Sequence, residues 1–299
     1  MTQMITPTRF TFVALTVGLM LLSADRIAAQ ATRPFVPKAA GAYRGDAASV
    51  AEILEQLASN DPAQKQHALE AIRARMQTRG LTELRATWLR PLANAKMHKE
   101  VADLAMEGIL AHAWDTRSVE SVLQMRIKSL IALNQPQQAL SEAKSLFNVA
   151  TMLGTSEAIL TVAECLNAAY PNDPAMFNKF REEQMAGAVP PSTQPGDPAA
   201  APRKCTVLAG IKVDPRPWEQ ALKNLTGEDA QTLMARGNLL LLADRVAEAR
   251  TIFERLYSLS SADITEASEA LARCIKAEDG TIGRANAWVL SIRPKPPRP

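Results

Sequence analysis

Histidines and pairs of carboxylates are the side chains in this sequence whose chemistry suits metal binding or acid–base catalysis. The chain contains three histidines, His67, His98 and His112. Two histidines on one helix share a metal ion when they stand about one helical turn apart. His98 and His112 are separated by roughly 21 Å along an α-helix. The spacing therefore predicts no metal site and disfavours histidine as an acid–base catalyst.

Two acidic pairs, Glu182–Glu183 and Glu52 with Glu55, are the remaining candidates for acid–base chemistry. Neighbouring carboxylates on a helix usually form a solvated face. The sequence also lacks a phosphate-binding glycine loop, a serine-hydrolase elbow, a zinc-protease motif and a haem-attachment motif. We therefore predict a protein that is not an enzyme, has no catalytic or metal-binding residue, and uses no cofactor.

The three cysteines, Cys165, Cys205 and Cys274, form no CxxC motif. Cys165 and Cys274 lie within apolar faces of predicted helices, and Cys205 follows a proline-rich segment. This pattern favours small buried side chains over a redox or zinc role. The alternative is a single disulfide that involves Cys205, and the sequence leaves its pairing open.

Charge and composition exclude several protein classes. Lysine and arginine number 34 against 31 acidic residues, which gives a net charge of +3. This balance disfavours a nucleic-acid binder that relies on a basic surface. Alanine accounts for 51 of the 299 residues, and aromatic residues for 5%. Because alanine favours helices and sits poorly in strands, the composition predicts an all-α fold.

Residues 1–31 have the features of a secretory signal peptide. Arg9 supplies the positive charge that precedes an apolar stretch, and Ala29 and Ala31 supply the small residues of a cleavage site. We expect cleavage before Thr32, with cleavage before Gln30 as a close second. An uncleaved anchor is the alternative, but the apolar stretch is shorter than the ~20 residues that span a bilayer. The mature protein is thus expected to be exported, periplasmic or extracellular, and without a membrane span.

Two predicted helical blocks follow this signal. Residues 32–45 have the composition of a flexible leader, and helical periodicity then extends over 46–186. Residues 187–203 include the sequence VPPSTQPGDPAAAPR, which is typical of a semi-extended linker. A second helical block covers 204–293, and a proline-rich tail, predicted to be disordered, covers 294–299. We expect the linker to let the two blocks move relative to each other.

The second block contains the spacing of a helical hairpin. Gly237 would let two helices approach closely, Ala249 would lie at their crossing, and Phe253 would fill the space behind it. Asp244 and Arg245 fall where the hairpin would turn. The run Leu239–Leu242 covers every side of one helix, which suits a helix that is packed on both flanks.

This segment, with Leu233, Arg236 and Leu240, resembles the tetratricopeptide repeat. Leu233, Arg236 and Ser261 replace the Trp, Leu and Pro that the repeat usually has. Weaker matches recur on either side, so the chain resembles a tetratricopeptide-type α-solenoid over 116–292. The earlier segment 47–113 resembles HEAT-like helical hairpins. The resemblance implies helical-hairpin repeats that stack to complete a shared core.

The resemblance also implies a binding surface, because ligands of tetratricopeptide proteins usually lie along a face formed by the first helix of each hairpin. The residues expected on this face are Gln124 and Lys128 in the first block, and Gln231, Met234, Asn238 and Leu241 in the second. The corresponding residues of the last hairpin, among them Ala267, Ala270 and Cys274, are small and apolar. They favour core or a docking seam over a polar site.

The sequence therefore predicts an exported, non-enzymatic helical-repeat protein that binds a protein or peptide partner in the cell envelope. No nucleic-acid partner is expected. Two alternatives stay open. One is an envelope enzyme that acts on polysaccharide through two carboxylates about 5–10 Å apart in a deep cleft. The other is a purely structural subunit of a larger complex, which large exposed apolar patches would support.

Overall fold

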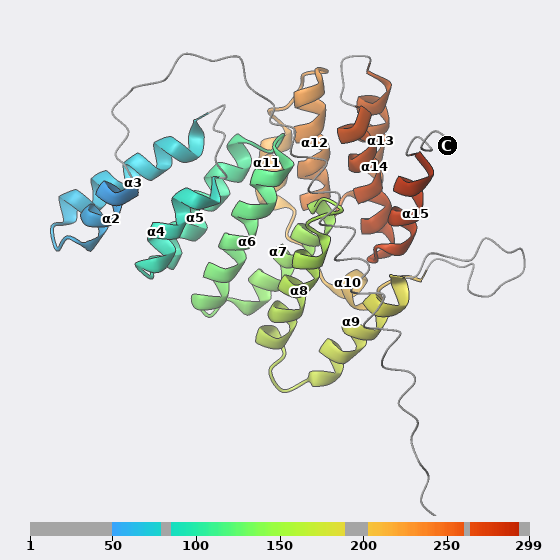
Figure 1. Cartoon of the computed structure of the whole chain (residues 1–299), viewed down its shortest axis with the longest axis horizontal. Helices are drawn as coiled ribbons and strands as arrows, with labels where there is room; N and C mark the ends of the chain where they lie inside the picture. Colours follow the sequence, from blue (N-terminus) through green and yellow to red (C-terminus); the bar gives the residue numbers. More distant parts are fainter. Residues whose placement is uncertain (1–49, 79–84, 189–202, 260–263, 293–299) are drawn as a thin grey trace, which may run out of the picture. The chain divides into compact units, whose positions relative to one another are not determined.

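The computed structural model describes residues 50–78, 85–188, 203–259 and 264–292 (Figure 1). Within these ranges the regular structure is entirely α-helical, with fourteen helices and no strand, which confirms the all-α fold class. The predicted signal peptide, leader and tail, and nearly all of the predicted linker, lie outside the described residues. None of the helices in the described ranges is long and apolar enough to cross a membrane.

The first block consists of eight helices, each of which packs against the next along the chain. Asp61 and Asp173 cap two of them by accepting hydrogen bonds from the amides of Ala63 and Ala175 at 2.9 and 3.2 Å. A proline follows each cap at the first helical position, where no backbone donor is needed. The helices are α2 (Val50–Ala58), α3 (Pro62–Gln77), α4 (Ala86–Asn94), α5 (His98–Ala111), α6 (Thr116–Ala132), α7 (Pro136–Val149), α8 (Thr155–Ala169) and α9 (Pro174–Gly187).

The second block begins with a segment, 205–213, whose sequence is compatible with a strand or a helix. Its first part forms a short helix, for which Cys205 is the N-cap. The helices of this block are α10 (Thr206–Gly210), α11 (Arg216–Leu222), α12 (Ala230–Leu242), α13 (Val246–Ser258), α14 (Ile264–Asp279) and α15 (Gly283–Ile292).

Three hairpin turns have the same backbone geometry. Lys96, Asn134 and Asp244 adopt left-handed conformations with φ of 58°, 58° and 61°. In each turn, the amide of the next residue donates to the carbonyl oxygen five positions before it, at 2.8–2.9 Å. This bond satisfies a carbonyl that the helix end leaves free. The turns connect α4 to α5, α6 to α7, and α12 to α13, so these three hairpins share the same turn conformation.

The α12–α13 hairpin has the close approach that its sequence predicts. Phe253 and Ala249 are fully buried, and a Cβ atom on Gly237 would overlap the ring of Phe253. Glycine is therefore required where the ring of one helix rests on the backbone of the other. All four leucines of Leu239–Leu242 are buried, which confirms that α12 is packed on more than one side.

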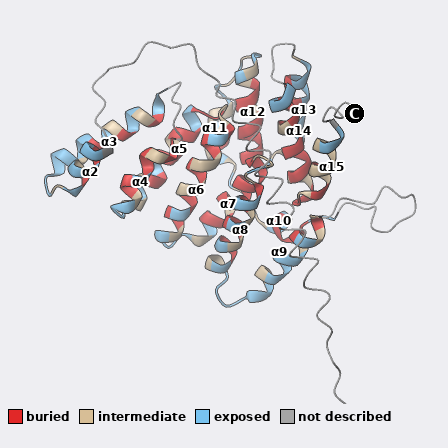
Figure 2. Ribbon diagram, viewed as in Figure 1, coloured by how far each residue is buried: buried red, intermediate tan, exposed pale blue. Residues whose placement is uncertain are grey.

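The two blocks share one hydrophobic core, which continues from Ile53 on α2 to Cys274 on α14. Helix α7 of the first block packs against both α12 and α14 of the second. Figure 2 shows that buried residues dominate α12 and α14, whereas α2 and α3 are mostly exposed. Ala267 and Ala270 are buried on α14, as expected for a docking seam.

Polar side chains on α7 also join the blocks. Ser145 donates to the carbonyl oxygen of Leu242 at 2.7 Å, and Asn148 donates to that of Leu241 at 3.2 Å. The ammonium of Lys144 lies 2.6 Å from a carboxylate oxygen of Asp244. Buried side-chain bonds of this kind fix one orientation of the two partners. They contradict the expected relative movement of the blocks, because the described helices on either side of the linker form a single packed unit.

Candidate functional site

A cleft of about 400 Å³ opens between α6, the end of α7 and the start of α8. The loop that joins α7 to α8 forms part of its wall. The polar groups that line it belong to Arg117, Glu120, Ser121, Gln124, Glu157 and Glu269, and the apolar groups to Leu146, Ala150, Leu153 and Ala158. The cleft thus combines an apolar surface with charges of both signs, which is typical of a binding pocket.

One face of α6 provides a polar edge of this cleft. Arg117, Ser121, Gln124 and Lys128 follow one another at intervals of four, three and four residues, so they share that face. The amide nitrogen Nε2 of Gln124 donates to the carboxylate of Glu157 on α8 at 2.6 Å. This bond shows that the polar faces of α6 and α8 meet, and that the cleft lies where they meet.

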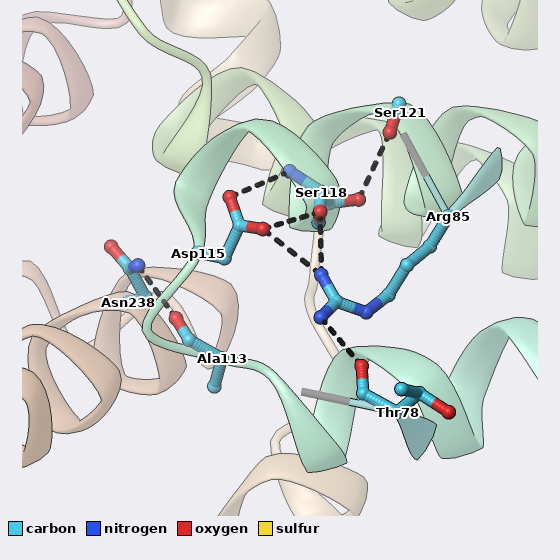
Figure 3. A network of polar contacts seen from close by, with 7 residues as sticks. All are labelled: Thr78, Arg85, Ala113, Asp115, Ser118, Ser121 and Asn238. Atoms are coloured by element: carbon cyan, nitrogen blue, oxygen red, sulfur yellow. Dashed lines mark hydrogen bonds and ion pairs between the residues drawn. The ribbon is translucent and has the colours of Figure 1, made fainter. Parts of the chain in front are cut away.

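A salt bridge between the buried Arg85 and the half-buried Asp115 sets the start of α6. Figure 3 shows the guanidinium of Arg85 bonded to Asp115 at 3.0 Å, to the hydroxyl of Ser118 at 2.9 Å, and to the carbonyl oxygen of Thr78. Asp115 is also the N-cap of α6 and accepts from the amide of Ser118 at 3.2 Å. Because Arg85 is 1% exposed, this network holds the first turn of α6 and, with it, the cleft residue Ser121.

Two glutamates hold the loop at the base of the cleft. The carboxylate of Glu120 accepts from the backbone amide of Thr151 and from its hydroxyl, and that of Glu269 accepts from the amide of Met152 at 3.2 Å. A Cβ atom on Gly154 would overlap Glu120. Both glutamates therefore satisfy backbone donors of an irregular segment and give it a defined conformation.

Two fully buried cations of α14 lie beneath this loop. The ammonium of Lys276 donates to the carbonyl oxygen of Ala150 and to Thr155 Oγ1, the latter at 3.2 Å. The guanidinium of Arg273 donates to the carbonyl oxygen of Val149 at 3.2 Å. Both carbonyls belong to the C-terminal end of α7, where the helix dipole favours positive charge. The cations thus serve as a C-terminal cap that comes from another helix.

Aromatic rings and acidic groups complete the surroundings of these cations. Lys276 Nζ lies 5.0 Å from the ring centroid of Phe147, and the guanidinium carbon of Arg273 lies 5.3 Å from that of Phe253. Burial, together with the nearby charge of Arg273, lowers the pKa of Lys276 to about 7. Burial also raises the pKa of Glu120, although its bonds to Thr151 and the charge of Lys276 oppose that rise. The loop therefore rests in part on Lys276, whose ionisation is sensitive to pH near neutrality.

The structure separates the six residues that were expected to bind a partner. Gln124 lines the cleft. Lys128 is exposed on the same face of α6, one turn beyond it, and Gln231 is exposed on α12, outside the cleft. Met234, Asn238 and Leu241 are 5%, 0% and 0% exposed. These last three assignments are wrong as a partner-binding face, because α12 is covered on that side by neighbouring helices.

Asn238 instead connects three parts of the chain. Its amide nitrogen donates to the carbonyl oxygen of Ala113 at 2.7 Å, as Figure 3 shows, and to the hydroxyl of Thr116 at 3.1 Å. Its amide oxygen accepts from Arg273 at 2.7 Å. Every polar atom of the side chain thus has a partner within the core, which leaves none for a peptide.

Most residues that line the cleft were not among the partner-binding residues expected from the sequence. Arg117 precedes Ser121 and Gln124 at helical spacing, so periodicity on α6 was a usable signal for it. Glu157 and Leu153 lie near the start of α8, which is the first helix of the next hairpin. The expectation that ligands lie along the first helix of each hairpin therefore applies to them as well. Glu269 had no local signal, because its contact with Met152 spans 117 residues of sequence.

Cysteine and histidine form no reactive centre in the described part of the chain. Cys165, Cys205 and Cys274 are buried and unpaired, in agreement with the favoured interpretation and not with a disulfide at Cys205. Burial raises the pKa of Cys165 and Cys274 to about 12 and that of Cys205 to about 11, so the thiols stay protonated. The described residues contain no cluster of His, Cys, Asp or Glu that could hold a metal ion.

No family model, curated protein or solved structure matches this chain. The resemblance to tetratricopeptide and HEAT repeats therefore stays a prediction. The helical-hairpin architecture itself comes from the structure.

Lys276 makes stability depend on pH. Its pKa is lowered from 10.5 to about 7 in the folded chain, so between these values the unfolded chain binds more protons than the folded one. The free energy of unfolding must then rise with pH through this window, by up to about 1.4 kcal/mol per pH unit. In urea unfolding, the free energy of unfolding of the wild type should rise by about 1 kcal/mol more than that of Lys276→Met between pH 7.5 and pH 8.5.

The control for this measurement is Lys223→Met, because Lys223 is exposed. Its stability curve should run parallel to that of the wild type. If the curve of Lys276→Met is parallel as well, Lys276 does not carry a lowered pKa in the folded protein.

Proposed function

We propose that this protein is an exported, non-enzymatic helical-repeat protein that binds a protein or peptide partner through the groove between α6 and α8. The observation that carries the proposal is the cleft of about 400 Å³, with an apolar surface and charges along its edges. The groove is defined by the polar face of α6 and by Glu157, Leu160 and Glu164 on α8, three exposed residues at helical spacing.

The charges of the groove suit an extended chain that carries both signs. Arg117 and Lys128 give α6 a basic edge, whereas Glu157 and Glu164 give α8 an acidic edge. Among the described residues, neither Arg117 nor Lys128 forms an ion pair, so both guanidinium and ammonium remain available to a carboxylate. Complementary charges of this kind mainly determine which partner binds and how fast it associates.

Two leucines supply the apolar contact that binding energy requires. Leu153 is 71% exposed and Leu160 is 59% exposed, so together with Leu290 they are the most exposed leucines of the described residues. An apolar side chain that covers Leu153 would also reach Leu146 and Ala158 in the cleft wall. Central apolar anchors within a polar rim are the usual form of a peptide-binding site.

The glutamates of the loop support recognition more than catalysis. Both carboxylate oxygens of Glu120 accept hydrogen bonds from Thr151, and Glu269 accepts one from Met152. These bonds order the loop before a partner arrives. A preformed site loses less conformational entropy on binding than a flexible one.

A peptide library displayed on phage tests the groove. We expect the wild type to enrich peptides that share an apolar residue flanked by charges. Leu153→Asp should weaken binding of these peptides at least about tenfold, because it places a charge against the apolar wall. Leu290→Asp is the matched control, since Leu290 is 65% exposed on α15, outside the groove. Dissociation constants from fluorescence anisotropy give the readout.

Two results would contradict the proposal that this groove binds a peptide. The first is the absence of any enriched peptide. The second is a set of enriched peptides that bind Leu153→Asp as tightly as the wild type, or that lose affinity equally with Leu290→Asp.

Export rests on residues 1–31, which lie outside the described part. We propose that their charge and apolar pattern direct secretion and that a peptidase then removes them. Mass spectrometry of the protein recovered from the extracytoplasmic fraction should give a chain that begins at Thr32 or at Gln30. Recovery of a chain that retains residues 1–31 would overturn cleavage, and recovery only from the cytoplasm would overturn export.

A further inference from the structure

A second cavity, of about 520 Å³, lies where the second block closes against the first. Side chains of α7, α8 and α9 form one side of it, and α10 with the two residues that follow forms the other. Its volume falls in the range of pockets that hold small organic ligands. None of its lining residues belongs to the groove between α6 and α8, so it is a separate site.

The walls of the cavity are mixed, because polar and apolar groups contribute about equally to its surface. Leu140 and Leu166 form its base and are each 2% exposed. Met176, Val207 and Ile211 complete the apolar lining. An unbranched aliphatic chain matches such a surface, because methionine and leucine adapt to a flexible apolar ligand without requiring polar partners.

The ionisable groups of the lining, apart from the phenol of Tyr170, are two lysines, Lys179 and Lys212. Lys212 is exposed and forms no ion pair within the described ranges. Lys179 lies 4.0 Å from the nearest carboxylate oxygen of Glu183, and its side chain is 59% exposed. No carboxylate lines the cavity, so the charge presented to a ligand is positive.

Glu183 offsets part of the charge of Lys179, whose ammonium lies 4.0 Å from its carboxylate. It accepts from the hydroxyl of Thr206 at 2.5 Å, from the amide of Val207 at 3.0 Å and from the thiol of Cys205 at 3.2 Å. These bonds hold the first turn of α10 against α9. Glu183 thus fixes the wall of the cavity, and of the two lysines only Lys212 is without an ion pair among the described residues.

We propose that this cavity binds an amphipathic anion, a straight aliphatic chain that ends in a carboxylate. The chain lies against Leu140, Leu166 and Met176, and the carboxylate lies at the rim that bears Lys179 and Lys212. Apolar burial supplies affinity, and the lysines select an anionic over a cationic or neutral head group.

Isothermal titration calorimetry with octanoate, decanoate and dodecanoate, each below its critical micelle concentration, tests the proposal. We expect binding that strengthens about fourfold for each methylene that enters the cavity. Dodecyltrimethylammonium and dodecanol, which keep the chain but change the head group, should bind at least about tenfold more weakly than dodecanoate.

Variants assign the binding to this cavity. The double variant Lys179→Gln with Lys212→Gln should weaken dodecanoate binding at least about tenfold, because both cationic groups are lost. Met176→Trp should abolish binding by filling the cavity. Lys223→Gln is the control for charge, since Lys223 is exposed and outside the lining, and it should bind as the wild type does. Thermal melting confirms that each variant is folded.

Three results would overturn the proposal. They are no binding of dodecanoate to the wild type, equal affinity for the carboxylate and the trimethylammonium head group, and unchanged affinity in the folded double-lysine or Met176→Trp variant. A failure here leaves the groove between α6 and α8 untouched, because the two sites share no residue.

Discussion

The docking of two buried cations of α14 on the C-terminal end of α7 is the interaction on which the described structure depends. A helix end leaves carbonyl groups without partners, and burying them unpaired is costly. Arg273 and Lys276 satisfy the carbonyls of Val149 and Ala150. Removing two charges from water also carries a large cost. The helix dipole, the rings of Phe147 and Phe253, and the carboxylates nearby offset part of that cost, and the part that remains lowers the pKa of Lys276.

This interaction links the junction of the blocks to both candidate sites. The carbonyl of Ala150 begins the loop that lines the groove between α6 and α8, and the glutamates around Lys276 and Arg273 hold the rest of that loop. On another side of the junction, α10 packs on α9 through Glu183 and closes the anion-binding cavity. Gln184 adds a further bond, from α9 to the carbonyl oxygen of Gly280. Neither site would keep its shape if the blocks moved apart.

Local structure was largely predictable from the sequence because its causes are local. The aspartate caps, the turns at Asn134 and Asp244, and the contact of Gly237 with Phe253 all depend on residues close together in the chain. The cleft was only partly predictable. Gln124 follows from helical spacing, but Glu269 reaches the cleft only because α14 docks on α7. No periodicity within a single helix contains that information.

The misplaced residues on α12 show the same limit. A run of leucines around the whole helix indicated burial on several sides, which disfavours Met234 and Leu241 as accessible groups. The partners of Asn238, among them Arg273 on α14, are remote in sequence. An asparagine with a buried, distant partner has the same local sequence pattern as one that faces solvent. Only the packing of the second block on the first distinguishes the two.

The central claim, that buried contacts and not the linker hold the blocks together, is tested most directly by cutting the chain between them. A protease site placed within residues 189–202 allows the folded protein to be cleaved into two fragments. The account predicts that the fragments co-elute as one species in size-exclusion chromatography at physiological salt. Separate elution of two folded fragments would contradict it.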